Sequence, residues 1–189
     1  MQVAEWATAV GEFLIAGVIL WEMEENRRER FLAEAAQIGN YEARGKIYSA
    51  FYDTAGESIK DRSEEFCKRI WKEEKDNTEL KRSCEHQIVL FNRLGQISRR
   101  AWFYKRDYVK LFPHAVVLFW IMIRPYIVER RAMTGDWWAS DFQQLTKQCL
   151  KFLFDDNPNA QLSLYDRDRQ RKKDLIIPTS HLRELQDEL

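Results

Sequence analysis

Residues 115–123 read AVVLFWIMI and stand between Pro113 and Pro125. A helix of this length is about 14 Å long, whereas the hydrocarbon core of a bilayer is roughly 30 Å thick, so the run is too short to cross a membrane. Because it is apolar on every side, it predicts a helix buried at the centre of a folded domain. Proline fits the first turn of a helix and bends one in its interior, so each flanking proline can start or kink a helical piece.

Amphipathic helical patterns extend outward from this run in both directions. Residues 41–53, 57–76 and 78–100 precede it, a further helix is expected to begin near Asp107, and residues 137–154 follow. Their apolar side chains recur three or four positions apart. Turn-forming sequences separate the segments at Gly39-Asn40, at residues 53–56 and at residues 134–136. We find no convincing alternation of apolar and polar residues typical of a strand, so the sequence predicts an all-α fold.

The composition indicates a folded chain of balanced charge. Its 189 residues include 30 Lys and Arg against 30 Asp and Glu, and 7 Trp, 7 Tyr and 11 Phe that need a core to bury them. A net charge of zero argues against a dedicated nucleic-acid binder, whose surface is usually basic. Three cysteines without the spacing of metal ligands indicate a reducing compartment for the folded part.

Residues 3–22 read VAEWATAVGEFLIAGVILWE, the most apolar stretch of twenty residues in the chain. As a helix they reach about 30 Å, the thickness of a bilayer core. Their eight Val, Phe, Leu and Ile residues favour insertion by roughly 2.4–4.8 kcal/mol, and Glu12 at the centre opposes it by about 2.5–3.5 kcal/mol. The balance is close to zero, so the segment is a marginal membrane span. The residues after it are helix formers, and we expect the helix to continue as a stalk to Gly39-Asn40.

The residues that flank this segment favour a transmembrane helix. Three arginines occur within residues 27–30 and no Lys or Arg comes earlier, which predicts an N-terminus outside the cell and a cytoplasmic domain. The missing early basic residues and the lack of a small-residue cleavage site argue against a secretory signal. Trp6 and Trp21 lie about 22 Å apart along a helix, near the two interfaces of a membrane. We therefore expect a single-pass protein of the cell membrane.

Two architectures remain open at this point. In a bilayer, Glu12 would normally face a partner or a cavity, so the helix would be stabilised by another transmembrane protein. The alternative is a soluble helical binding or regulatory adaptor, with the N-terminal helix packed in its core and Glu12 at the rim or paired. The chain is expected to divide into an anchor helix (1–24), a helical bundle domain (25–154) and a polar, irregular C-terminal tail (155–189) that docks on something or is mobile.

Sequence signatures of catalysis are missing. The seven glycines stand at least six residues apart, which excludes a GxGxxG loop or a P-loop, and there is no HExxH or GxSxG. None of the three histidines has a Glu three positions before it, as a ferritin-like di-iron site requires. Cys84 and His86 point in different directions on a helix, and Cys84 lies on an apolar stripe. We expect a non-enzymatic protein without catalytic residues, cofactor, metal or an evident small-molecule substrate.

A spaced set of residues resembles a pattern in a large group of small bacterial proteins of unknown activity. It comprises Phe91-Asn92-Arg93-Leu94-Gly95, Asp107-Tyr108-Val109, Leu111-Phe112, Trp120, Pro125-Tyr126 and Arg130. The resemblance covers roughly residues 5–153 and implies a membrane-anchored cytoplasmic helical domain, with no catalytic residues to transfer. Glu12 departs from the group's hydrophobic helix. From the residues themselves, Trp120 indicates a buried face, and Gly95 indicates a close approach of two helices.

We expect this chain to act as an accessory or scaffold subunit of a larger membrane protein complex, in contact with the lipid bilayer and with another membrane protein. Aromatic residues concentrate binding energy at interfaces, and one of the neighbours Trp137 and Trp138 is expected to belong to the core. Residues 99–106 mix cations and aromatic rings as an RNA binder would, but the same side chains can cover a helix connection. The partner-binding candidates are Glu12, Trp6, Trp21, Trp102, Trp137 and Trp138.

Overall fold

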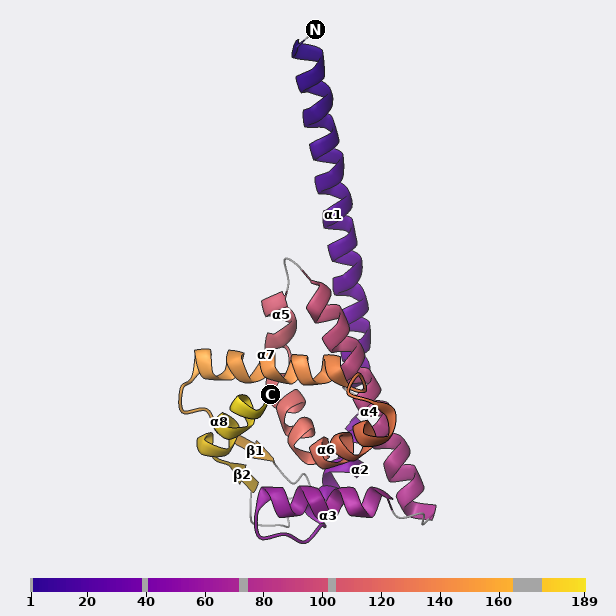
Figure 1. The fold of residues 1–189 in the computed structure, drawn as a ribbon, viewed down its shortest axis with the longest axis vertical. Coiled ribbons are helices and arrows are strands. Elements are labelled where there is room, and N and C mark those ends of the chain that lie inside the picture. Colours follow the sequence, from indigo (N-terminus) through magenta and orange to yellow (C-terminus); the bar gives the residue numbers. More distant parts are fainter. Residues whose placement is uncertain (1, 39–40, 72–74, 102–104, 165–174) are drawn as a thin grey trace.

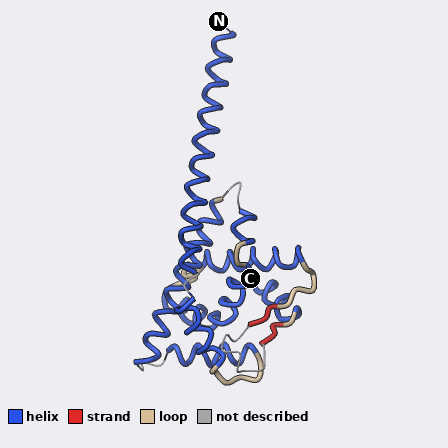
Figure 2. Tube along the Cα trace, turned by 180° about the vertical axis from the view of Figure 1, so that it is seen from behind, coloured by secondary structure: helices blue, strands red, loops and turns tan. Residues whose placement is uncertain are grey.

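The computed structural model describes residues 2–38, 41–71, 75–101, 105–164 and 175–189, and most of them are helical (Figure 1; Figure 2). The helices are α1 (Gln2–Ile38), α2 (Tyr41–Tyr52), α3 (Ile59–Trp71), α4 (Lys75–Arg100), α5 (Lys105–Lys110), α6 (Pro113–Thr134), α7 (Ser140–Asp156) and α8 (Thr179–Glu188). Two short strands, β1 (Leu162–Leu164) and β2 (Leu175–Ile177), lie between α7 and α8. The predicted all-α class is confirmed.

The N-terminal part of α1 projects from the rest of the molecule as a stalk (Figure 1; Figure 2). The helix is 37 residues long and ends at Ile38, next to the Gly39-Asn40 pair predicted to stop it. Every side chain from Glu12 to Met23 is exposed. The alternative in which this segment packs into the domain core is therefore wrong for residues 12–23. Within the ranges described, no helix combines the length and the apolar character needed to cross a membrane.

Helix α6 is the buried centre of the domain, as its apolar run predicts. Pro113 occupies the first turn, and the helix continues through Pro125 to Thr134 without ending. All residues from Val116 to Ile123 are buried. The helix packs against α3, α7 and β1. A proline in the first turn lacks only an N–H that would have no partner there, which explains why the helix can begin at this position.

The side chain of Phe142 on α7 connects three other aromatic rings in the core. Its ring stacks on Phe91 of α4 with centroids 5.1 Å apart and on Phe119 of α6 at 6.0 Å, and it meets the edge of Trp120 at 5.0 Å. Such aromatic pairs contribute to the stability of the fold beyond the hydrophobic gain from the area that they bury. The buried face predicted around Trp120 is confirmed.

Helices α4 and α7 approach each other closely at Gly95, as predicted. A Cβ atom added there would lie 2.0 Å from the backbone oxygen of Asp141, so only glycine fits without a shift. One turn earlier on α4, Asn92 Oδ1 accepts a hydrogen bond of 3.0 Å from the Phe142 N–H and so satisfies a free donor in the first turn of α7. The Asn92 and Gly95 of the bacterial pattern thus hold α7 in place.

The C-terminal segment differs from the prediction. Strands β1 and β2 pair antiparallel, with Leu162 opposite Ile177, and α8 follows directly. Leu182 and Leu185 of α8 are buried, and Arg183 contacts the Phe154 ring and donates to the Pro158 carbonyl at 3.0 Å. The expectation of an irregular tail is wrong for residues 175–189, whereas the expectation that the tail docks is confirmed for them, because apolar side chains fix them to the domain. Residues 165–174, which include most of the predicted polar part of the tail, lie outside the description.

Candidate functional surfaces

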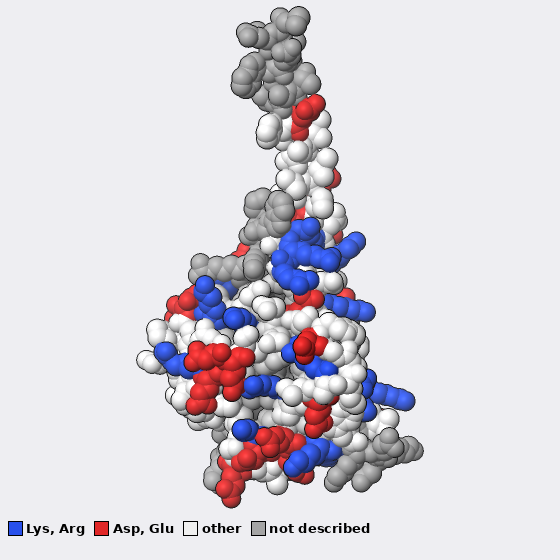
Figure 3. Space-filling model, viewed as in Figure 1, with Lys and Arg blue, Asp and Glu red and all other residues white. Residues whose placement is uncertain are grey.

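The stalk of α1 presents apolar side chains on all its sides. Among them, Phe13 is 82% exposed, Leu14 66% and Ile15 63%, and Val18, Ile19, Leu20 and Trp21 are also exposed. Because successive helical residues are rotated by about 100°, residues 13, 14, 15, 18, 19, 20 and 21 leave no polar face wider than about 100°. The described stalk surface carries little charge above the domain (Figure 3).

The second half of α1 is docked on the domain, and the docking begins at Glu24. From residue 12 onward, Glu24 is the first buried side chain, and the Arg27 guanidinium donates to it at 3.1 Å and to the backbone oxygen of Arg100 at 2.7 Å. One turn further, Phe31 is fully buried and stacks on Phe112 with centroids 5.8 Å apart. Helix α1 runs without a break from the stalk into this docked half.

Basic residues gather where the stalk meets the domain (Figure 3). The hydrogen bond from Arg27 to the Arg100 carbonyl brings the end of α4 against α1, so the exposed Arg99 and Arg100 join the arginines of α1 at this level. Several of these cations are paired locally: Arg28 lies 3.2 Å from Glu25, and Arg99 lies 3.2 Å from Asp141. The junction between the stalk and the domain is thus rich in arginine, but these ion pairs offset part of its positive charge.

The candidate tryptophans are distributed over separate elements. Trp21 is 58% exposed on the stalk, and Trp137 is 71% exposed in the turn between α6 and α7. Trp138 is partly buried, with its ring 6.1 Å from Tyr126, so one member of this pair is a core residue as predicted. The side chain of Trp6 and the whole of Trp102 lie outside the described residues. Of the described candidates, Trp21 therefore lies on the stalk, apart from the pair at residues 137 and 138.

The three thiols are unsuited to nucleophilic chemistry. Cys84 is fully buried, Cys67 is 2% exposed and Cys149 is 1% exposed, and all three are free thiols that form no disulfide. Burial raises the pKa of Cys67 to about 12, and its Sγ donates to the Met122 carbonyl at 3.6 Å. Burial likewise raises the pKa of Cys84 and of Cys149. Because the thiolate is the reactive form, these residues act as small core side chains.

A polar cluster joins α4 to α6. The Tyr126 hydroxyl donates to Glu85 Oε1, and Arg130 Nη2 lies 4.0 Å from the same oxygen. Burial, together with this carboxylate, raises the pKa of Tyr126, so the hydroxyl remains a neutral donor. The next residue, His86, is exposed and points elsewhere. The cluster therefore fixes two helices together.

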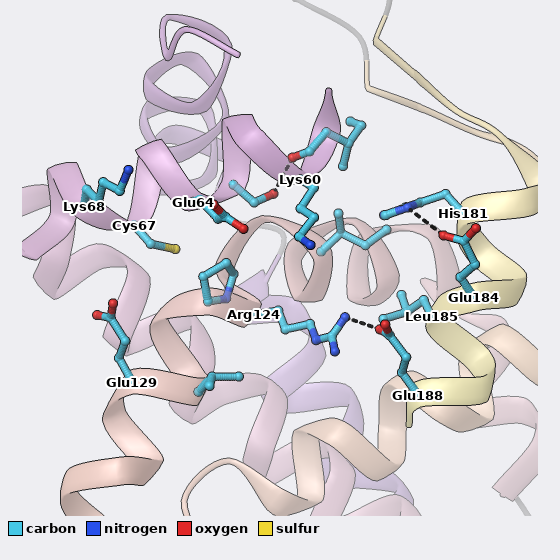
Figure 4. A pocket seen from close by; sticks show the side chains of 15 residues that line it. Lys60, Glu64, Cys67, Lys68, Arg124, Glu129, His181, Glu184, Leu185 and Glu188 are labelled. Atoms are coloured by element: carbon cyan, nitrogen blue, oxygen red, sulfur yellow. Dashed lines mark hydrogen bonds and ion pairs between the residues drawn. The ribbon is translucent and has the colours of Figure 1, made fainter. Parts of the chain in front are cut away.

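A groove of about 580 Å³ lies between α3, α6 and α8, and the sequence analysis did not predict it (Figure 4). Most of its lining residues are polar residues at ordinary positions of amphipathic helices, so no motif indicates it. One ion pair, Arg124 with Glu188, joins α6 to α8 beside it, and within α8 the His181 Nδ1 lies 3.9 Å from Glu184. Among the described residues, no three His, Cys, Asp or Glu side chains gather to hold a metal ion, in the groove or elsewhere.

Comparison of the chain with family models, with curated proteins and with solved structures finds no match. The resemblance to the bacterial group therefore rests on its residues alone. In the structure, Asn92, Gly95 and Trp120 serve the packing of α4, α6 and α7. A spaced set of packing residues of this kind carries information on the fold and none on activity.

Proposed function

We propose that the chain is a single-pass, membrane-anchored accessory or scaffold subunit of a larger membrane protein complex. Residues 3–22 of α1 lie in the bilayer in this proposal, with the N-terminus outside and the helical domain in the cytoplasm. The observation that carries it is the stalk, whose apolar side chains between Phe13 and Trp21 point in every direction and are exposed.

The distribution of these side chains favours lipid over a protein groove. A helix that docks in a groove buries one apolar stripe and keeps its opposite face polar. The stalk has no such polar face between Phe13 and Trp21. Lipid surrounds a helix on all sides and matches this arrangement. The arginines of α1 and α4 at the base of the stalk favour a cytoplasmic domain, because basic residues accumulate on that side of a membrane helix.

Glu12 supports a partner within the membrane. It stands near the middle of residues 3–22 and is exposed, so within the described chain no packing shields it. A carboxylate at the bilayer centre costs about 2.5–3.5 kcal/mol, which cancels most of the gain from the eight large aliphatic and aromatic residues. A neighbouring transmembrane helix with a polar group would remove this cost and would make association part of membrane insertion.

The test is extraction of the full chain from its native membranes in mild detergent, followed by identification of proteins that co-purify in stoichiometric amount. We expect Glu12→Leu to insert more readily but to lose its partner, and the matched variant Glu22→Leu, at the end of the apolar segment, to keep it. Partner recovery that is equal for wild type and Glu12→Leu would remove the carboxylate from recognition. A chain recovered alone from the soluble fraction would overturn the membrane proposal and leave a soluble adaptor whose residues 12–23 lie outside its core.

A further inference from the structure

The floor of the groove between α3, α6 and α8 is apolar. It is formed by Ile59 of α3, Ile121, Pro125 and Val128 of α6, and Leu185 of α8. Ile121 and Leu185 are only 5% and 3% exposed, so the floor reaches the domain core. A cavity of about 580 Å³ has the size of sites that take small molecules, and is too small for a folded partner.

One end of the groove offers a cation. Lys60 points from α3 into the space between the three helices (Figure 4). The other basic groups at this end already have partners, since Arg124 pairs with Glu188 and His181 Nδ1 lies 3.9 Å from Glu184. No carboxylate of the described chain lies within ion-pair distance of Lys60. Its ammonium is therefore free to bind an anionic group of a ligand.

The opposite end of the groove offers two carboxylates. Glu64 of α3 and Glu129 of α6 lie on either side of Cys67 (Figure 4). Burial is the main cause of the raised pKa of that thiol, and the negative charges of both carboxylates add to it, which places both close to it. Within the described residues neither carboxylate has a basic partner. This end of the groove therefore suits an ammonium group.

The spacing of the two ends sets the length of the ligand. Lys60 and Glu64 are four residues apart on α3, and Lys60 and Cys67 are seven apart, which correspond to about 6 Å and 10 Å along the helix axis. An extended chain advances roughly 3.3–3.6 Å per residue, so two or three residues cover this distance.

We propose that this groove binds a short apolar peptide with free termini, its carboxylate at Lys60 and its ammonium between Glu64 and Glu129. The apolar side chains rest on Ile121, Pro125 and Leu185. The site is independent of the membrane proposal, because α3 lies at the end of the domain farthest from the N-terminus (Figure 1).

The test is calorimetric titration of the full chain in mild detergent with the tripeptide Ala-Val-Leu in its free, N-acetylated and C-amidated forms. Each blocked terminus loses one charge-assisted contact, and we expect each to weaken binding about tenfold. In Lys60→Met the free and C-amidated peptides should bind equally. In the double variant Glu64→Gln, Glu129→Gln the free and N-acetylated peptides should bind equally.

Lys147→Met is the matched control, because Lys147 is also an exposed helical lysine, lies on α7 and does not line the groove. It should retain the preference for free termini, and circular dichroism of each variant checks the fold. Two results would overturn the proposal. One is wild-type protein that takes up none of the three peptides at millimolar concentration, and the other is equal affinity of wild type for the free, the N-acetylated and the C-amidated peptide.

Discussion

The contact between α4 and α7 at Gly95 gives a prediction whose size follows from the structure. In Gly95→Ala the new Cβ would lie 2.0 Å from the Asp141 oxygen, and ordinary contact begins at 3.4 Å. The two helices would have to separate by the difference, about 1.4 Å, because the Cβ is fixed rigidly to the backbone of α4 and the oxygen belongs to the backbone of α7. The hydrogen bond from the Phe142 N–H to Asn92, now 3.0 Å long, would then exceed hydrogen-bonding distance.

Three terms give the magnitude. Overpacking of this kind costs about 1–3 kcal/mol, and loss of the Asn92 hydrogen bond costs about 0.5–1.5 kcal/mol. Replacement of glycine by alanine inside a helix stabilises the folded state by about 1 kcal/mol. The expected net loss of stability is therefore about 0.5–3.5 kcal/mol. Gly45→Ala is the matched control, because an added Cβ in α2 meets nothing within 4 Å and should stabilise by about 1 kcal/mol.

The assay is thermal unfolding of both variants and of the wild type in the same detergent. For a chain of this length 1 kcal/mol corresponds to about 2–4 °C in Tm, so Gly95→Ala should melt below the wild type and Gly45→Ala slightly above it. If both variants are stabilised alike, the helices do not meet at Gly95, and the packing of α4 on α7 described above is refuted.

Three further variants or conditions test the same core. Trp120→Ala should lower the free energy of unfolding by about 3–5 kcal/mol in denaturant titration, whereas Trp137→Ala, at a position 71% exposed, should change it by less than about 0.5 kcal/mol. Ser58 donates its hydroxyl to Asp61 and accepts the Asp61 N–H at 3.1 Å at the start of α3, so Ser58→Ala should cost about 1 kcal/mol in the same titration. Cysteine thiols ionise near pH 8.5 in the unfolded chain, but burial raises the pKa of Cys67 to about 12 in the folded protein. The folded state is therefore destabilised as the pH rises between these values, and the urea midpoint of unfolding should fall. A midpoint that stays constant over this range would mean that the thiols are exposed to water.

Much of the helical framework could be predicted from the sequence. Residues 115–123 are apolar on every side, and only the domain centre suits such a helix. The stop at Gly39-Asn40, the close approach at Gly95 and the burial of one tryptophan of the pair at 137–138 follow from local patterns in the same way. Each of these features depends on a few neighbouring residues, which is the range over which periodicity carries information.

The features that the sequence did not predict depend on distant contacts. Strands β1 and β2 are each three residues long, too short for an alternation of apolar and polar residues to be recognised, and they pair across the intervening residues 165–174. The groove combines side chains of α3, α6 and α8, each of which looks like an ordinary solvent-facing residue of its own helix. The favourable and unfavourable contributions to membrane insertion of residues 3–22, including the cost of Glu12, nearly cancel. The sequence therefore left open whether this segment lies in lipid or in the core of the domain.

The most direct test of the membrane proposal is the fractionation of cells that express the full chain, with an alkaline carbonate wash of the membranes. Leu14→Arg places a charge near the middle of residues 3–22 and should cost about 3–4 kcal/mol of insertion, whereas Met23→Arg adds a cation at the domain end, where it is favourable. We predict wild type and Met23→Arg in the washed membranes and Leu14→Arg in the supernatant. Wild type found in the supernatant, or all three proteins in the same fraction, would contradict the membrane anchor.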